Sequence, residues 1–390
     1  MLGLLALSLL GAAGCTSTRT AGSAHDGATA AAHMPGAARG EFDARGSWSV
    51  LCAARPGPGL RADLQRVVPE SLRAKVIPLG MTATGRAAYV SIWTPRYAGV
   101  AELNLATGRM RRIQSFTNRV TDQADGSSDG GWLVWEETYS LQSLDHFTVY
   151  AWNPDSGRLL RLGQSLAGPG GVPWPSPWHP PAVSAHYAAW AQGYGPDGEV
   201  EIRLADLATG QVKVIRTGHT QPPFFDGSLL VWPESDRPGT QTSLHAYSLV
   251  TGKLAGLPPV LRPVHGTEFV VTDGTRTSYL SPDLTALYYS AAQAERARLA
   301  LRLPAGVDFA DLTMGAGWLA WTTTAATYLA STATGRYAQV TPEYGIATGP
   351  GPDALISDPA SAKTAHPILP MHVIHPARIA WPSCQASRGR

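Results

Sequence analysis

The sequence predicts an all-β fold in which one structural unit is repeated around a ring. Three observations lead to this prediction. An aromatic residue, usually Trp, recurs every 42 to 60 residues at the end of a short apolar run. A Thr-Gly or Ser-Gly pair follows many of these runs, and 41 Gly and 31 Pro supply many tight turns. A repeat of this length with four short strands is typical of a propeller blade, so we expect a single β-propeller.

The repeated aromatic positions set the expected number of blades. They are Trp93, Trp135, Trp190, Trp232, Tyr279, Trp321 and Trp381. Seven positions favour seven blades. The fifth repeat lacks the Thr-Gly pair, and its residues 287–303 also fit an Ala-rich helix, so six blades stay possible. Because stacked blades bury the aromatic position between them, we interpret these residues as core.

The Gly-containing pairs predict hairpins between the outer strands of each blade. They lie at 107–108, 156–157, 209–210, 251–252 and 334–335. Gly adopts the positive φ that a tight hairpin requires, so these short turns are expected at one end of the ring. The connections after the repeated Trp and between blades lie at the other end, which we call the loop face. Loop length varies more on this face, as expected where a scaffold carries its binding residues.

The repeated pattern resembles a known group of propellers. Asp226-Gly227 precedes the apolar run that ends in Trp232, and an Asp-Leu-x-Thr-Gly turn spans residues 206–210. This combination is similar to TolB-type and WD-repeat-like propellers of bacterial envelopes and archaeal surface proteins. The resemblance covers roughly residues 80–385. It implies the fold and no particular activity, because the group serves many tasks.

The first residues predict export. Residues 2–10 are an apolar run that is too short to span a bilayer and is typical of a signal peptide. Small residues then precede Cys15, which resembles the lipobox of bacterial lipoproteins. We therefore expect a signal peptide over 1–14, a polar tether over 15–40 with lipidated Cys15, and the propeller over 41–390. The protein would be extracytoplasmic and anchored to the membrane by its lipid only. The alternative is a secreted protein with an ordinary cleaved signal.

The remaining cysteines predict how the ring closes. Residues 47–52 are an unassigned strand, and the last blade lacks its outer strands, so pairing of the N- and C-terminal strands would remove two exposed edges. Cys52 and Cys384 each follow one of these strands. Export permits disulfides, so we expect a Cys52–Cys384 bond, with two free thiols as the alternative.

Candidate binding residues lie on the loop face. They are Arg96, Glu136, Glu137, Trp174, Trp178, His179, Tyr194, Glu234 and Asp236. Prolines around the two Trp of loop 168–181 restrict the backbone, so both rings are either displayed to a ligand or folded back onto the blade junction.

Several classes of site find no support. The net charge is +2 without a basic stripe, which argues against nucleic-acid binding. Asp125 and Asp129 are compatible with an ion, but no calcium-loop spacing is present. His372 and His375 differ by three positions and face opposite sides of a strand, so no metal site is expected beside them or His366. No nucleophile elbow or phosphate-binding loop occurs, and no cofactor is predicted.

These observations favour a monomeric, non-catalytic binding or assembly module for an envelope protein or a cell-wall glycan. The alternative is an extracytoplasmic polysaccharide-acting enzyme, a glycoside hydrolase or lyase, that uses loop-face carboxylates such as Glu136 and Glu234. A sensor for another envelope protein is a third possibility, without a feature that distinguishes it.

Overall fold

The computed structural model describes residues 51–53, 75–118, 122–138, 146–174, 179–195, 197–237, 240–267, 269–292, 294–303, 309–324, 326–341, 346–348, 351, 353–357 and 371–381. All of them belong to one compact unit, Pro35–Arg390. Their regular structure consists of β-strands and two short 3₁₀ turns, Pro169–Gly171 and Pro376–Arg378. The all-β prediction is therefore confirmed. The predicted boundaries at residues 14 and 40 lie outside the described residues and stay predictions.

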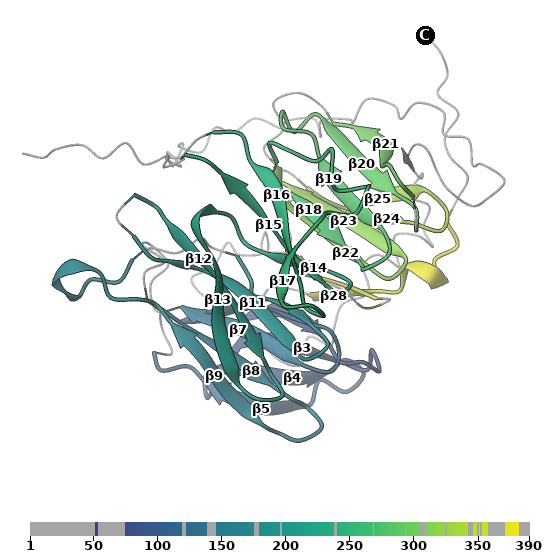
Figure 1. Ribbon diagram of the computed structural model, residues 1–390. Coiled ribbons are helices and arrows are strands. Elements are labelled where there is room, and N and C mark those ends of the chain that lie inside the picture. Colours follow the sequence, from purple (N-terminus) through teal and green to yellow (C-terminus); the bar gives the residue numbers. More distant parts are fainter. Residues whose placement is uncertain are drawn as a thin grey trace, which may run out of the picture. The chain divides into compact units, whose positions relative to one another are not determined.

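The strands follow one another as antiparallel meanders (Figure 1). The first two meanders are β2 (Lys75–Met81), β3 (Ala87–Trp93), β4 (Ala98–Asn104), β5 (Met110–Ser115), and β6 (Gln123–Ser128), β7 (Leu133–Thr138), β8 (Phe147–Trp152), β9 (Leu159–Gln164). The next two are β10 (Ala182–Ser184), β11 (Tyr187–Gly193), β12 (Val200–Asp206), β13 (Gln211–Thr220), and β14 (Phe224–Asp226), β15 (Leu229–Ser235), β16 (Ser243–Ser248), β17 (Lys253–Ala255). The last three are β18 (Val270–Thr272), β19 (Thr277–Leu280), β20 (Ala286–Ser290), β21 (Arg298–Arg302); β22 (Phe309–Gly315), β23 (Trp318–Thr323), β24 (Thr327–Ser331), β25 (Arg336–Thr341); and β26 (Ile346–Thr348), β27 (Ala354–Ser357), β28 (Met371–Ile374).

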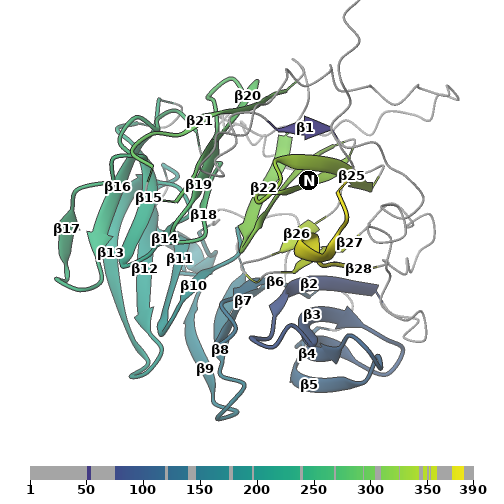
Figure 2. The same ribbon diagram turned by 90° about the vertical axis from the view of Figure 1, so that its right-hand side faces the viewer.

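The meanders are arranged as a closed ring (Figure 2). The innermost strands β2, β6, β10, β14, β18, β22 and β26 each contact the next one, and β26 contacts β2. This arrangement is a β-propeller. Hydrogen bonds divide the described strands into six sheets, because β13 pairs with β15 and joins two meanders, whereas chain order gives seven groups. The choice between six and seven blades therefore stays a prediction.

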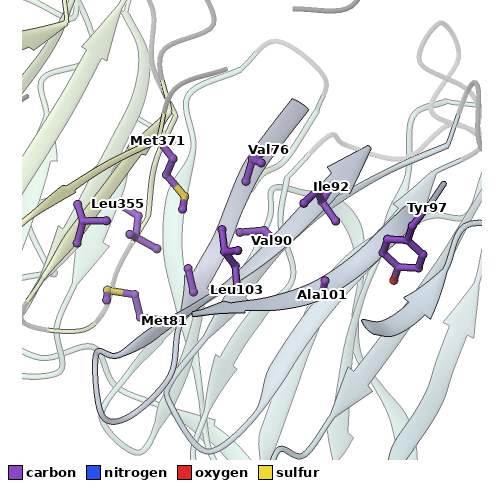
Figure 3. Packing of buried hydrophobic residues seen from close by; sticks show 11 residues of the cluster. Val76, Met81, Val90, Ile92, Tyr97, Ala101, Leu103, Leu355 and Met371 are labelled. Atoms are coloured by element: carbon purple, nitrogen blue, oxygen red, sulfur yellow. The ribbon is translucent and has the colours of Figure 1, made fainter. Parts of the chain in front are cut away.

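Hydrophobic packing closes the ring between its first and last sheets (Figure 3). Val76 and Met81 of β2 and Val90 of β3 share one buried cluster with Leu355 of β27 and Met371 of β28. Residues almost 300 positions apart in the chain thus form one interface. Burial of apolar surface stabilises by about 25 cal/mol per Å². The first and last sheets of the ring are therefore held together here by hydrophobic packing rather than by a shared strand.

The N-terminal strand corrects the expected closure. β1 (Cys52–Ala53) does pair with the C-terminal part of the chain, but its partner is β25, in parallel and in the sheet before the last. Leu51 is fully buried, and its N–H donates to the carbonyl of Ala300 in the neighbouring sheet (2.5 Å). Within the described residues 51–53, the N-terminal segment therefore bridges two outer strands instead of pairing with the last sheet. Residues 47–50 lie outside the described part.

Cross-strand register shows which aromatic positions are equivalent. Trp135, Trp232, Tyr279 and Trp321 each stack on the residue opposite them in the following strand, with ring centroids 5.1 to 6.1 Å apart. Trp190 takes the same place opposite Arg203. Because a strand positions side chains by its register, these five rings repeat from sheet to sheet.

The first and last of the repeated aromatic residues, Trp93 and Trp381, do not occupy the equivalent strand position. Trp93 is the final residue of β3, whereas the five equivalent rings lie inside their strands. Trp381 follows the 3₁₀ turn instead of ending a strand, and its indole N–H donates to the carbonyl of Pro376 (3.0 Å). Its ring packs with Trp318 in the core of the preceding sheet. The possible helix over 287–303 is also excluded, because β20 and β21 occupy most of it.

The predicted hairpins occur as expected. Gly108, Gly157, Gly210, Gly252 and Gly335 have φ between 63° and 80°, and each follows the third strand of its meander. A side chain at such a φ is strained, which explains why the repeat keeps Gly there.

Candidate functional site

Two carboxyl groups lie directly opposite each other on neighbouring strands. Asp125 of β6 and Glu136 of β7 are register partners, so their side chains share one face of the sheet. Burial, together with the nearby charge of Asp125, raises the pKa of Glu136 to about 8. Burial likewise raises the pKa of Asp125 to about 6, against the lowering effect of His179. Near neutral pH this pair therefore holds about one proton.

A third carboxyl group, on another sheet, acts electrostatically on Asp125. Asp311 occupies the third position of the innermost strand β22, as Asp125 does in β6. Burial raises the pKa of Asp311, while His179 and a hydrogen bond from the Thr313 hydroxyl (3.1 Å) lower it. The charge of Asp311 also acts on Asp125. We call Asp125, Glu136 and Asp311 the inner carboxylate cluster.

Glu136 is the least compensated member of the inner carboxylate cluster. Its side chain is only 7% exposed, and its carboxyl makes no hydrogen bond within the described residues. By contrast, Asp125 accepts the Gly126 N–H (2.9 Å) and keeps partial contact with solvent. The Glu136 oxygens are not among the fully enclosed polar atoms without a partner, so they stay open to solvent. A largely desolvated carboxyl that is open and unpaired would gain from a hydrogen-bond donor, so this position suits a ligand.

His179 is the basic side chain that acts on the inner carboxylate cluster. It lies exposed in the connection before β10, and its charge affects both Asp125 and Asp311. The same connection contacts β6 directly, because the Ser127 hydroxyl donates to the carbonyl of Pro181. Loop 168–181 thus ends over the face that carries Asp125. His179, predicted as a binding residue, is brought to the inner carboxylate cluster.

A metal centre is not supported. Within the part of the chain that the structure describes, no three His, Cys, Asp or Glu side chains come close enough to hold one ion. Asp125 and Asp129 belong to different surroundings, because Asp129 caps the β6–β7 hairpin through the N–H groups of Gly131 and Trp132 (both 2.9 Å).

Two of the predicted acidic residues connect neighbouring sheets. Glu137 and Glu234 each lie two positions after a repeated Trp, and Gln192 holds the same place after Trp190. Each side chain reaches back to the outer strand of the preceding sheet. Glu137 accepts from Gln114 (3.2 Å), Gln192 donates to the carbonyl of Gln164 (2.8 Å), and Glu234 accepts from Arg216 (3.0 Å).

The surroundings of these two glutamates differ. Burial raises the pKa of Glu137 to about 7, although the Thr117 N–H hydrogen bond opposes this shift. Burial also acts to raise the pKa of Glu234, but hydrogen bonds from Arg216 and the Trp232 indole outweigh it, and the net pKa is lowered. Glu234 is therefore an ionised partner of Arg216 near neutral pH. A binding role for either residue stays a prediction.

The other predicted residues lie apart from the cluster. Arg96, Tyr194 and Asp236 are exposed, each in the connection that follows a different Trp strand. Tyr194 exposes 46% of its surface. The structure does not gather them into one site with Glu136.

Loop 168–181 folds back in its first half. The backbone N–H of Trp174 donates to the carbonyl of Leu166 (2.9 Å), and its indole packs against Gly168. Trp174 is therefore half-buried on its own loop rather than fully displayed. Trp178 lies outside the described residues.

The cysteine predictions are not tested by the described part of the chain. Cys15 and Cys384 lie outside it, and for Cys52 only the backbone is described. The histidines near the end are separated, since His372 is buried in β28 and His375 pairs with Asp353 (2.6 Å). His366 lies outside the described residues. None of the described helical turns is long and apolar enough to cross a membrane.

Sequence reasoning missed Asp311 and Gln192, although both carry a signal. Asp125 and Asp311 each lie ten positions before a repeated Trp, Trp135 or Trp321. Likewise, an acidic or amide residue stands two positions after Trp in three successive repeats. Alignment of the repeats on their Trp would have revealed both positions.

Comparison with known proteins supports the fold. No family model matches the sequence, and no curated protein matches it significantly. Among solved structures, the chain is similar to a prolyl endopeptidase (TM-score 0.50, 14% identity, 85% of this chain). It spans 51% of that protein, about half of its length.

Two further solved structures are similar to the chain. An oligogalacturonate lyase from Vibrio parahaemolyticus has a TM-score of 0.50 at 9% identity, over 79% of this chain and 92% of the lyase. TolB from Acinetobacter baumannii has a TM-score of 0.39 at 13% identity, over 68% of this chain and 66% of TolB. At such low identity these likenesses concern the fold alone. Lipid attachment stays a prediction.

Proposed function

We propose that the protein is a non-catalytic binding module of the cell envelope that holds a positively charged group of its ligand at the inner carboxylate cluster. One observation carries this proposal: the Glu136 carboxyl has no hydrogen-bond partner within the described residues, is not fully enclosed, and lies opposite Asp125. A ligand with a primary ammonium group would donate hydrogen bonds to these oxygens and compensate their charge.

The charge of the site favours a cation over an anion. Among the described residues, Asp125 acts on Glu136, Asp311 acts on Asp125, and His179 acts on both aspartates. An anionic polymer would meet like charge here, whereas an amine-bearing glycan or a basic protein segment would meet opposite charge. The predicted export and lipid anchor would present such a site to the envelope.

Binding of a cation is expected to release protons. The raised pKa values of Asp125 (about 6) and Glu136 (about 8) mean that the free cluster is partly protonated near pH 7. A bound cation favours the ionised carboxylates, so affinity for oligolysine, whose amines stay protonated over this range, should rise as the pH increases from 6 to 8.

The test is calorimetric titration of the purified protein with glucosamine oligomers, oligolysine and the N-acetylated forms of both. We expect binding of at least one amine-bearing probe, loss on acetylation, and at least tenfold weakening in Asp125→Asn and Asp311→Asn. Asp155→Asn, an exposed carboxylate in the opposite hairpin, is the matched control. Equal affinity for acetylated probes, or no binding of either amine, would sink the proposal.

A second candidate is a polysaccharide-acting enzyme. It is favoured by the pairing of one carboxyl with a pKa of about 8, suited to donate a proton, and one with a pKa of about 6, suited to accept it. Release of new chain ends from a neutral or aminated glycan, abolished in Glu136→Gln, would support this candidate over the first.

A further inference from the structure

A separate hollow opens on the loop face, between the sheets that carry β15 and β19. Its volume is about 250 Å³. The connections after β13, β15, β17 and β19 form its wall, so four segments distant in sequence converge on it. Its lining residues are Gln221, Thr240, Gln241, Thr242, Gly266, Thr267, Phe269, Pro282 and Leu284.

The lining combines uncharged polar groups with apolar surface. Among the residues that the structure describes there, it contains hydroxyl and carboxamide groups and no Asp, Glu, Lys, Arg or His. The side-chain amides of Gln221 and Gln241 make no hydrogen bond within the described residues, so both can donate to and accept from a ligand. Neutral donors and acceptors without a fixed charge match a neutral, hydroxyl-rich ligand better than an ionic one.

An aromatic ring adds an apolar surface to the hollow. Phe269 is half-buried, and its ring is held edge-on by Phe309 with centroids 5.1 Å apart. A fixed aromatic ring beside amide groups suits a sugar ring, which has an apolar C–H face and a polar rim of hydroxyls.

The rim of the hollow is held in a defined shape. Leu284 adopts φ +57°, a left-handed conformation that is uncommon for a residue other than Gly. Its N–H donates to the carbonyl of Ser281 (2.9 Å), which fixes the turn. Across the hollow, Gly266 has φ +68°, and a Cβ there would lie 3.0 Å from Pro282. Gly thus allows the two walls to approach each other. Strained positions of this kind are found at ligand sites.

We infer that this hollow is a second binding site, which takes one neutral pyranose unit. It contains no member of the inner carboxylate cluster and is formed by other loops, so the inference does not depend on a cation site. If both sites bind one polymer, the hollow binds an uncharged sugar unit and the inner carboxylate cluster binds an amine-bearing unit of the same polymer.

The test is ligand-observed NMR of the purified protein with neutral oligosaccharides: glucose, mannose, galactose and N-acetylglucosamine oligomers. Saturable binding of at least one neutral sugar is expected, weakened at least tenfold in Gln221→Ala and Gln241→Ala. Gln211→Ala, an exposed glutamine at the opposite end of β13, is the matched control and should bind as the parent does.

The outcomes separate the two sites. Asp125→Asn should leave neutral-sugar binding intact while it weakens amine binding. Absence of saturable binding for every neutral sugar would overturn the inference, as would unchanged affinity in both hollow variants. Preference for uronic acids or free amino sugars over their neutral forms in this hollow would also overturn it, whatever the cluster binds.

Discussion

Replacing Glu136 with Gln should stabilise the protein at alkaline pH and have little effect in acid. The folded-state pKa of Glu136 is about 8, whereas the ordinary value is 4.5. The folded protein therefore holds a proton that the unfolded chain has released. Stability contributed by this group falls as the pH rises from 4.5 to 8 and falls no further above pH 8. Below pH 4.5 both states are protonated, and the penalty disappears.

The size of the effect follows from the pKa difference. One pKa unit corresponds to 1.36 kcal/mol, so the upper bound above pH 8 is roughly 5 kcal/mol. Partial solvation of the Glu136 carboxyl and relaxation of its surroundings reduce this figure, and we expect about 2–4 kcal/mol. For a chain of this size, that is a rise in Tm of about 3–6 °C at pH 8.

The assay is thermal and urea unfolding of the parent protein and Glu136→Gln between pH 4.5 and 8.5. The difference in unfolding free energy should be near zero at pH 4.5 and grow with pH. Asp155→Asn is the control, because this carboxylate is exposed in a hairpin and should show no such growth. A variant that is less stable at every pH, or a pH-independent difference, would refute the assignment of a buried protonated carboxyl.

Three further predictions concern the joints and the core of the ring. Glu234→Gln should lower the unfolding free energy by about 1 kcal/mol at neutral pH. Because the pKa of Glu234 is lowered, this loss should vanish as the pH falls below that pKa, as denaturant titrations can measure. This trend with pH is opposite to that expected for Glu136→Gln. Trp321→Ala should lower the unfolding free energy by about 3–5 kcal/mol, since the ring is fully buried. A decrease below about 1 kcal/mol in chemical unfolding would contradict this prediction. Mass spectrometry without reduction should find Cys52 and Cys384 joined, a bond that stabilises by about 5 kcal/mol in the loop-entropy model, whereas two alkylatable thiols would exclude it.

The three glutamates that follow repeated Trp residues show how much of a side chain's role its position in the sequence can predict. Glu136 was recognised as a candidate because it follows a repeated Trp, and the structure places it in the inner carboxylate cluster. Glu137 and Glu234 were chosen on the same grounds, yet their side chains connect sheets. In a strand, successive side chains point to opposite faces. Adjacent residues such as Glu136 and Glu137 can therefore differ, one lying in the inner carboxylate cluster and the other connecting two sheets.

The sequence alone determined the all-β class, the repeated strands and the Gly hairpins, because each depends on residues that are close in the chain. Alternating burial and a positive φ are local properties, and they repeat with the blade. Only the tertiary structure decided how distant repeats meet. It placed Asp311 near Asp125, joined β1 to β25, and packed β2 on β27 and β28. These contacts depend on how the ring brings blades together, and no local pattern specifies which distant side chain lies opposite.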